Sequence, residues 1–323
     1  MVPGLILVLI FFSLVLIKAA EMVVVALRRV AAQTHTGVFA LAAILLALGT
    51  SFPELFVALT SSLESASNLS FGNVLGANIA NLSLVAGFSA LIAGRVNVRG
   101  DFLKRDVGIA LAAGVLPILL VLDGDLSRVD GLILITTYLA YATSLFRERF
   151  IEIAEEHKKE SFFYRFVRQF NHINGARKRE LGRLFIGVAL LLFSADMIVR
   201  VAKQIAVLAD LPVFLVGLVI LSIGTTLPEI AFSLRSVNDH EPGMFFGNIL
   251  GSIIANSTLV LGVAVTISPF SVVALEEYKE AVMFFVLIFL AFWFFVRSKM
   301  RLDRWEAGVL LLLYTAFVVT VFV

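Results

Sequence analysis

The chain has 323 residues, of which 60% are hydrophobic and only 15% are charged, whereas about 25% of the residues in ordinary soluble domains are charged. This composition excludes a water-soluble globule and a disordered chain, and the net charge of +2 is too small to indicate a nucleic-acid partner. The sequence has no cysteine, which excludes disulfides, thiolate metal sites and thiol nucleophiles. It therefore predicts an all-α polytopic membrane protein.

Ten segments are apolar and long enough to cross a membrane, which takes about 20 residues in a helix. In chain order they lie at 3–27, 37–63, 70–94, 106–122, 129–146, 183–208, 212–236, 243–267, 279–297 and 304–323. Basic residues gather in alternate connections, as at Arg28 and Arg29, and acidic residues gather in the others, as at Asp123 and Asp125. Because basic loops stay in the cytoplasm, we expect a multi-pass cell-membrane protein with both termini outside and the central loop inside.

Two sequence motifs occur twice, each time 175 residues apart. GTSFPE at 49–54 returns as GTTLPE at 224–229, and GNVLGANIAN at 72–81 returns as GNILGSIIAN at 247–256. The sequence thus divides into a five-helix repeat at 1–146, a charged linker at 147–182 and a second five-helix repeat at 183–323. Because each half has an odd number of spans, the second half must cross in the opposite sense, which gives ten transmembrane helices arranged as two inverted five-helix repeats. Transporters built in this way bind substrate near the midplane, on interrupted helices.

The first motif of each half predicts a broken helix that carries an acid. Pro53 and Pro228 lack an amide hydrogen, so the helix should break there and leave carbonyl groups without partners. Such groups are costly in hydrocarbon, and a dehydrated cation would satisfy them. Glu54 and Glu229 follow directly, and a buried acid at the bilayer centre costs at least about 2.5 kcal/mol. Together the two carboxylates match one divalent cation, and hard oxygen ligands favour calcium over zinc or copper.

The second motif supplies amides and small residues to helices that should face the broken ones. Asn81, Asn256 and Ser252 can complete a coordination shell around the cation. Asn73 and Asn248 are equally compatible with a ligand role and with hydrogen bonds between helices.

Two further acids, Glu21 and Asp196, lie inside predicted spans but away from the motifs. They could line an ion access path. We expect instead that they pair with Lys18 or Arg200, or reach toward the membrane surface.

At these motifs the sequence resembles the paired repeats of sodium/calcium exchangers, in the calcium/cation antiporter superfamily. The likeness covers nearly the whole chain apart from the linker, and it implies exchange of sodium for calcium by alternating access. It also implies the residues that bind the ions: the acids Glu54 and Glu229, the hydroxyls of Thr50, Ser51, Thr225, Thr226 and Ser252, the carbonyls of Ala47 and Ser222, and the amides of Asn81 and Asn256.

The chain departs from the family pattern at four motif positions. Ala77 stands where the first repeat often has Ser, and Thr226 replaces a Ser in the second. Ile253 replaces the usual Asn, and Asn256 stands where some prokaryotic relatives carry Asp. These changes leave the coupling ion and the stoichiometry open.

The sequence therefore predicts a secondary antiporter that exchanges sodium for calcium, with these inorganic cations and the lipid bilayer as its partners. It should be no enzyme and should need no cofactor. The nearest alternative is an antiporter that exchanges protons for calcium or another divalent cation. A non-transporting membrane scaffold whose linker binds a partner is a third reading. An intramembrane hydrolase is disfavoured because the spans hold no His–Glu metal motif and no Ser/His pairing.

Overall fold

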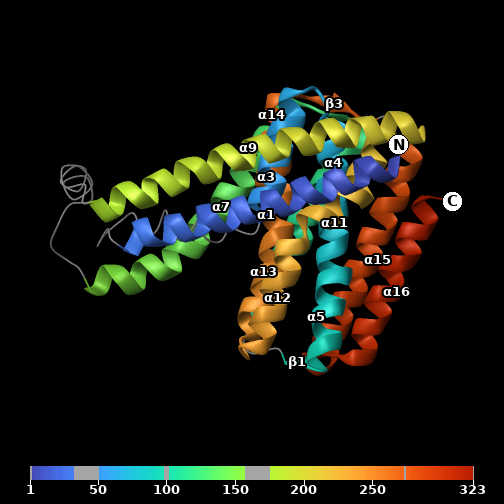
Figure 1. Cartoon of the computed structure of the whole chain (residues 1–323). Coiled ribbons are helices and arrows are strands. Elements are labelled where there is room, and N and C mark those ends of the chain that lie inside the picture. Colours follow the sequence, from blue (N-terminus) through green and yellow to red (C-terminus); the bar gives the residue numbers. More distant parts are fainter. Residues whose placement is uncertain (1, 33–50, 98–101, 157–174, 273, 323) are drawn as a thin grey trace.

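The computed structural model describes residues 2–32, 51–97, 102–156, 175–272 and 274–322, and these residues are mostly helical (Figure 1). The first half contains α1 (Val2–Ala32), α3 (Phe52–Leu63), α4 (Ser67–Ala80), η1 (Asn81–Val85), α5 (Ala86–Ala93), β1 (Arg95–Asn97), α6 (Phe102–Leu120), η2 (Val121–Asp123), β2 (Asp125–Leu126) and α7 (Arg128–Glu156). The second half contains α9 (Gly175–Ala209), α10 (Val213–Leu215), η3 (Val216–Leu221), α11 (Ser222–Thr225), α12 (Leu227–Asn238), α13 (Pro242–Ala255), η4 (Asn256–Val260), α14 (Leu261–Ile267), β3 (Phe270–Ser271), α15 (Leu275–Lys299), β4 (Arg301–Asp303) and α16 (Arg304–Val321).

Eight helices within the described residues are long and apolar enough to cross a membrane, and each matches a span predicted from the sequence. They are Pro3–Ala26, Ser67–Ala93, Asp106–Asp123, Arg179–Ala209, Val213–Asn238, Pro242–Ile267, Leu275–Ser298 and Arg304–Val321. The predicted span 37–63 is described only in its second part, where α3 forms a shorter apolar helix. The predicted span 129–146 falls within α7. The chain is therefore a multi-pass membrane protein.

Two helices, α1 and α9, lie side by side and run across the direction of α5, α12, α13, α15 and α16 (Figure 1). Gly187 permits their close approach, because a Cβ atom there would lie 2.7 Å from Cγ2 of Val23. Both helices carry an acid that pairs within its own helix, as the sequence predicted. Lys18 Nζ lies 2.8 Å from Glu21 Oε2 and Arg200 Nε lies 2.9 Å from Asp196 Oδ2.

Local backbone geometry recurs at the same 175-residue offset as the motifs. Ser51, just before α3, has φ −87° and ψ 8°, and Thr226, just before α12, has φ −85° and ψ 0°. The turns that end these two helices also match, because Ser65 and His240 adopt left-handed φ values of 56° and 61°. The backbone conformation at these duplicated positions is therefore nearly the same in the two halves, although the side chains of Ser65 and His240 differ.

In the part of the chain that the structure describes, four short strands, which the sequence did not predict, join the two halves. β1 pairs with β4 and β2 pairs with β3, each antiparallel, so every strand of one half pairs with a strand of the other. β1 and β3 lie at opposite ends of the molecule (Figure 1). Strands of two or three residues are too short for an alternating pattern to be visible in the sequence.

The outer surface of the helices is apolar and their interior holds many polar groups. Large hydrophobic side chains such as Leu7, Phe185 and Val207 are exposed, as expected for helices that face lipid. Many buried hydroxyl, amide and carboxyl groups lie on α3, α4, α11, α12 and α13. The two repeated motifs and the helices that carry them are therefore rich in buried polar groups, although a few others, such as Asp106 and Glu306, are buried elsewhere.

Candidate cation site

In the second half the predicted helix break is present between α11 and α12, and in the first half α3 begins at the matching position. Each of the two helices carries a glutamate in its first turn. α3 begins directly after Ser51 and α12 begins directly after Thr226, each with a proline in its first two positions. The first turn then holds Glu54 in α3 and Glu229 in α12. The start of a helix is its positive end, so both helix starts favour an ionised carboxylate at these positions.

Both glutamates are completely buried, with 0% of their surface exposed. Among the described residues, neither carboxylate oxygen of Glu54 or Glu229 has a hydrogen-bond partner. Thr225, four residues before Glu229, lies beside the Glu54 carboxyl group, which brings the two acids into one region of the structure. A buried charge without a partner is strongly unfavourable, so this pair requires neutralisation by protons or by cations.

Three neighbouring motif side chains also have buried polar atoms that lack a partner within the described part of the chain. These atoms are the hydroxyl of Ser51, both amide atoms of Asn81 and the Oδ1 atom of Asn256. Buried polar groups are almost always hydrogen-bonded in proteins. The segments that begin at Asn81 and Asn256 contact α12 and α3, the helices that carry the two acids. Hydroxyl and amide oxygens together with carboxylates are the ligand type that calcium prefers.

The threonine hydroxyls of GTTLPE, the second copy of the first motif, are engaged in hydrogen bonds. Thr225 lies beside the Glu54 carboxyl group and its hydroxyl donates to Asn73 Oδ1 at 3.2 Å. The Thr226 hydroxyl donates to the carbonyl oxygen of Ser222 at 2.8 Å. The same carbonyl accepts the Thr226 amide at 3.0 Å, so a cation bound at Ser222 would have to replace one of these bonds. Ser252 lies beside Glu229.

The helices that face the breaks widen at their motif asparagines. A π-helical segment begins at Asn81 and another at Asn256, and such segments are frequent at functional sites. Asn73 and Asn248 make contacts between helices, the second through its Nδ2 atom, 3.2 Å from the Ser233 hydroxyl. The interhelical role that the sequence left as one of two options is thus present in the structure.

One polar residue of the site, Asn78, is absent from the set inferred from the sequence. Its Nδ2 atom donates to the Ser257 hydroxyl at 2.7 Å, and its Oδ1 atom accepts from Asn256 Nδ2 at 3.4 Å. The position lies within the second motif of the first half, but its counterpart is the apolar Ile253. A search for polar residues shared by both halves therefore passes over it.

The broken helix of the second half packs directly on α4. A Cβ atom at Gly76 would overlap the carbonyl oxygen of Leu218, and a Cβ atom at Gly217 would overlap that of Leu69. The two backbones are therefore in contact, which small residues allow. This contact fixes α4, with Asn73 and Asn78, against the segment that leads to the break.

Two residues inferred from the sequence, Ala47 and Thr50, lie outside the described residues. Within the described part, no group of three or more His, Cys, Asp or Glu side chains could hold a metal ion. A cation at this site would therefore be held by the two glutamates together with neutral oxygens.

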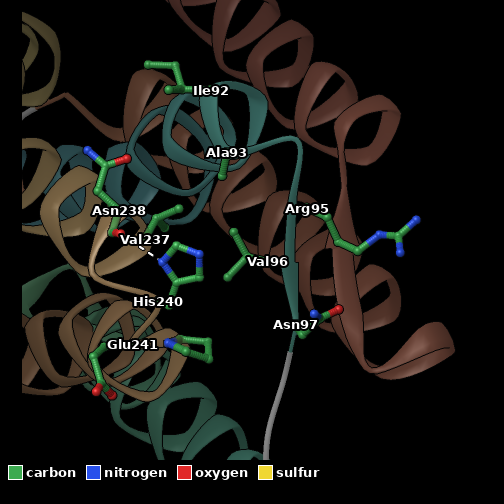
Figure 2. A pocket seen from close by; sticks show the side chains of 10 residues that line it. Ile92, Ala93, Arg95, Val96, Asn97, Val237, Asn238, His240 and Glu241 are labelled. Atoms are coloured by element: carbon green, nitrogen blue, oxygen red, sulfur yellow. Dashed lines mark hydrogen bonds between the residues drawn. The ribbon is translucent and has the colours of Figure 1, made fainter.

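A pocket of about 390 Å³ lies at the far end of α12, around the turn that leads to α13. Figure 2 shows the His240 ring on this turn next to Val96 of β1, while the Glu241 side chain points away from the strand. The His240 Nδ1 atom lies 2.9 Å from the carbonyl oxygen of Asn238. Asn238 stands nine residues after Glu229 on α12, which corresponds to about 14 Å along a helix. The pocket is thus separate from the buried glutamates.

Comparison with known proteins identifies the family. The profile of the family described as "Sodium/calcium exchanger protein" matches residues 4–147 and 180–323. The inner membrane protein YrbG of Escherichia coli is 32% identical over 224 residues, which cover 69% of this chain and 67% of that protein. The sodium/calcium exchanger MaX1 of Methanosarcina acetivorans is 27% identical over 95% of both chains. The solved structure of the sodium-calcium exchanger NCX_Mj with sodium and strontium is 25% identical, covers 99% of both chains and has a TM-score of 0.61. This chain therefore belongs to the sodium/calcium exchanger family.

Proposed function

We propose that this protein is a secondary antiporter that exchanges sodium for calcium across the membrane by alternating access. The observation that carries this proposal is the pair of completely buried glutamates, Glu54 and Glu229, whose oxygens lack partners within the described residues. The family and the name of the relative MaX1 support the same function.

Coupling follows from the charge of the pair. When both glutamates are ionised, the site carries a charge of −2, which one calcium ion or several sodium ions can neutralise. The empty site cannot pass an apolar barrier, because moving uncompensated charge into a low-dielectric region is strongly unfavourable. Each crossing then requires a bound cation set, so calcium moves one way only when sodium moves the other. No covalent step and no cofactor are involved.

The full ion-binding set that we propose extends beyond the two glutamates. It comprises the hydroxyls of Thr50, Ser51, Thr225, Thr226 and Ser252, the carbonyls of Ala47 and Ser222, and the amides of Asn81 and Asn256. The unpartnered oxygens of Ser51, Asn81 and Asn256 are the main support for this set.

For the architecture we propose ten transmembrane helices in two inverted five-helix repeats, at 1–146 and 183–323, with a cytoplasmic linker at 147–182. Matching backbone geometry at Ser51 and Thr226 supports the duplication. The placement of β1 and β3 at opposite ends of the molecule supports the inversion (Figure 1). The charges of the connecting loops favour both termini outside the cell membrane.

The test is calcium flux in liposomes that contain the purified protein. With calcium on one side, an imposed sodium gradient should drive calcium uptake against its own gradient, and collapsing the sodium gradient should stop it. Glu54→Gln and Glu229→Gln should each abolish the flux while the protein remains folded. Calcium uptake that does not respond to sodium would contradict sodium coupling.

Exchange of protons for calcium is the second candidate, and a specific feature favours it. Each buried carboxylate can be neutralised by a proton as well as by sodium, and Ala77 supplies no hydroxyl where a sodium ligand is common in the family. Uptake driven by a pH gradient at fixed sodium concentration would support this candidate over sodium exchange.

A further inference from the structure

The two motif asparagines that begin the π-helical segments are held differently. Asn256 is tied to another side chain through its Nδ2 atom, which lies 3.4 Å from Asn78 Oδ1. Its own Oδ1 atom has no partner among the residues that the structure describes. The amide of Asn81, by contrast, lacks a partner at both atoms within those residues. All three side chains are buried, with at most 2% of their surface exposed.

We propose that Asn78 is a positioning residue that turns the Oδ1 atom of Asn256 toward the transported cation. The inference rests on the proposed function, since it assumes that a cation binds beside Glu54 and Glu229. An amide can present either its oxygen or its nitrogen to a neighbour. Asn78 Oδ1 can only accept a hydrogen bond, so it binds the Nδ2 atom of Asn256. The Oδ1 atom of Asn256 is then left for the cation.

Asn78 is itself held in place by a second hydrogen bond. Its Nδ2 atom donates to the Ser257 hydroxyl at 2.7 Å, which leaves its Oδ1 atom as the acceptor for Asn256. Ser257, Asn78 and Asn256 therefore form a chain of side chains across the contact between α4 and η4. Partners of this kind, one step removed from a metal, orient its ligands and typically change metal affinity by about 10- to 100-fold when mutated.

The sequence provides an asparagine for this hydrogen-bond chain at only one of the two equivalent positions. The position 175 residues after Asn78 is Ile253, which is completely buried and cannot hydrogen-bond through its side chain. Asn81 consequently has no equivalent anchor among the residues that the structure describes. We infer that Asn256 is a fixed oxygen ligand, whereas Asn81 is free to reorient as the bound ion changes.

Calcium binding to the purified protein, measured by titration calorimetry, tests the inference together with calcium flux in liposomes. Asn78→Ile introduces the residue that the second half has at the equivalent position, Ile253. This substitution should weaken calcium binding by about 10-fold or more. The half-saturating calcium concentration for flux should rise by the same factor with little change in the maximal rate. Adding Ile253→Asn should recover only part of the affinity, because it supplies an amide near Asn81 but no hydroxyl like that of Ser257, whose counterpart is Leu82.

Two further variants separate positioning from folding. Ser257→Ala removes only the outer hydrogen bond, and it should raise the half-saturating concentration less than Asn78→Ile does. Asn248→Ile is the matched control, since Asn248 also makes an interhelical bond, at 3.2 Å to Ser233. The control should lower thermal stability without changing calcium affinity.

The outcomes are distinguishable. A wild-type protein that binds calcium, with an Asn78→Ile variant that binds it equally well, overturns the positioning role alone. Equal losses of affinity in Asn78→Ile and Asn248→Ile also overturn it, because the effect would then be one of packing. A wild-type protein that binds no calcium overturns the proposed function, and the positioning role with it.

Discussion

Lys203 on α9 reaches Glu64 at the end of α3, with its Nζ atom 2.7 Å from Glu64 Oε2 and 3.1 Å from the Glu64 carbonyl oxygen. Arg200 adds a longer contact to the same carboxylate at 3.5 Å. Glu64 ends the helix that begins beside Glu54. These contacts tie α9, which packs beside α1, to α3, the helix that carries the buried Glu54.

Reversing the charge of Lys203 should destabilise the protein, and reversing both partners should restore part of the stability, because Glu64→Lys also faces Arg200. Lys203→Glu places two acids together, whereas the double variant with Glu64→Lys restores the attraction. Since both side chains are partly exposed, at 33% and 22%, we expect a coupling free energy of about 1 kcal/mol. Thermal unfolding of the four proteins measures it.

Lys279→Glu is the matched control for that cycle. Lys279 lies 2.7 Å from Glu276 on the same helix, with both side chains largely exposed. This substitution should change thermal stability little. A coupling free energy between Lys203 and Glu64 no larger than that between Lys279 and Glu276 would show that the contact does not tie α9 to α3.

Neutralising a buried acid should stabilise the ion-free protein while removing its response to calcium. Glu54→Gln eliminates the repulsion between two buried carboxylates, so the melting temperature without sodium or calcium should rise. In the wild type, calcium at about 100 times its dissociation constant should add about 2.7 kcal/mol of stability. The variant should show no such gain, and a calcium-dependent rise of wild-type size in it would contradict the site.

Filling the contact between α4 and the second broken helix should be severely destabilising. Gly76→Ala introduces a methyl group where the Leu218 carbonyl oxygen lies, and overpacking of this kind typically costs about 1–3 kcal/mol, sometimes more. A Cβ atom at Gly308 on α16 has no described atom within 4 Å, so Gly308→Ala is the control. Detergent-solubilised yield and melting temperature should fall for the first variant and hold for the second.

The sequence was sufficient for the parts of the site that depend on local chemistry. Pro53 and Pro228 determine where the helices break, and the cost of a buried acid identifies Glu54 and Glu229. The spans were predictable because a helix in lipid must be apolar over a fixed length.

Other features depend on contacts that no local pattern encodes. β1 pairs with β4 across more than 200 residues of sequence, and its three residues show no strand signal. Asn78 gains its place from Ser257 and Asn256 on another helix, while the repeat itself offers only Ile253 at the matching position. α7 also runs to Glu156, ten residues beyond the predicted end of its span, because charged residues outside the bilayer can still be helical.

Counting the calcium ions bound per chain, in the wild type and in each single glutamine variant, tests the central claim most directly. If the two glutamates share one cation, the wild type binds one calcium ion at this site. Either Glu54→Gln or Glu229→Gln alone then eliminates this calcium binding. If one variant retains wild-type affinity, the two acids do not act as one site and the account of coupling is wrong.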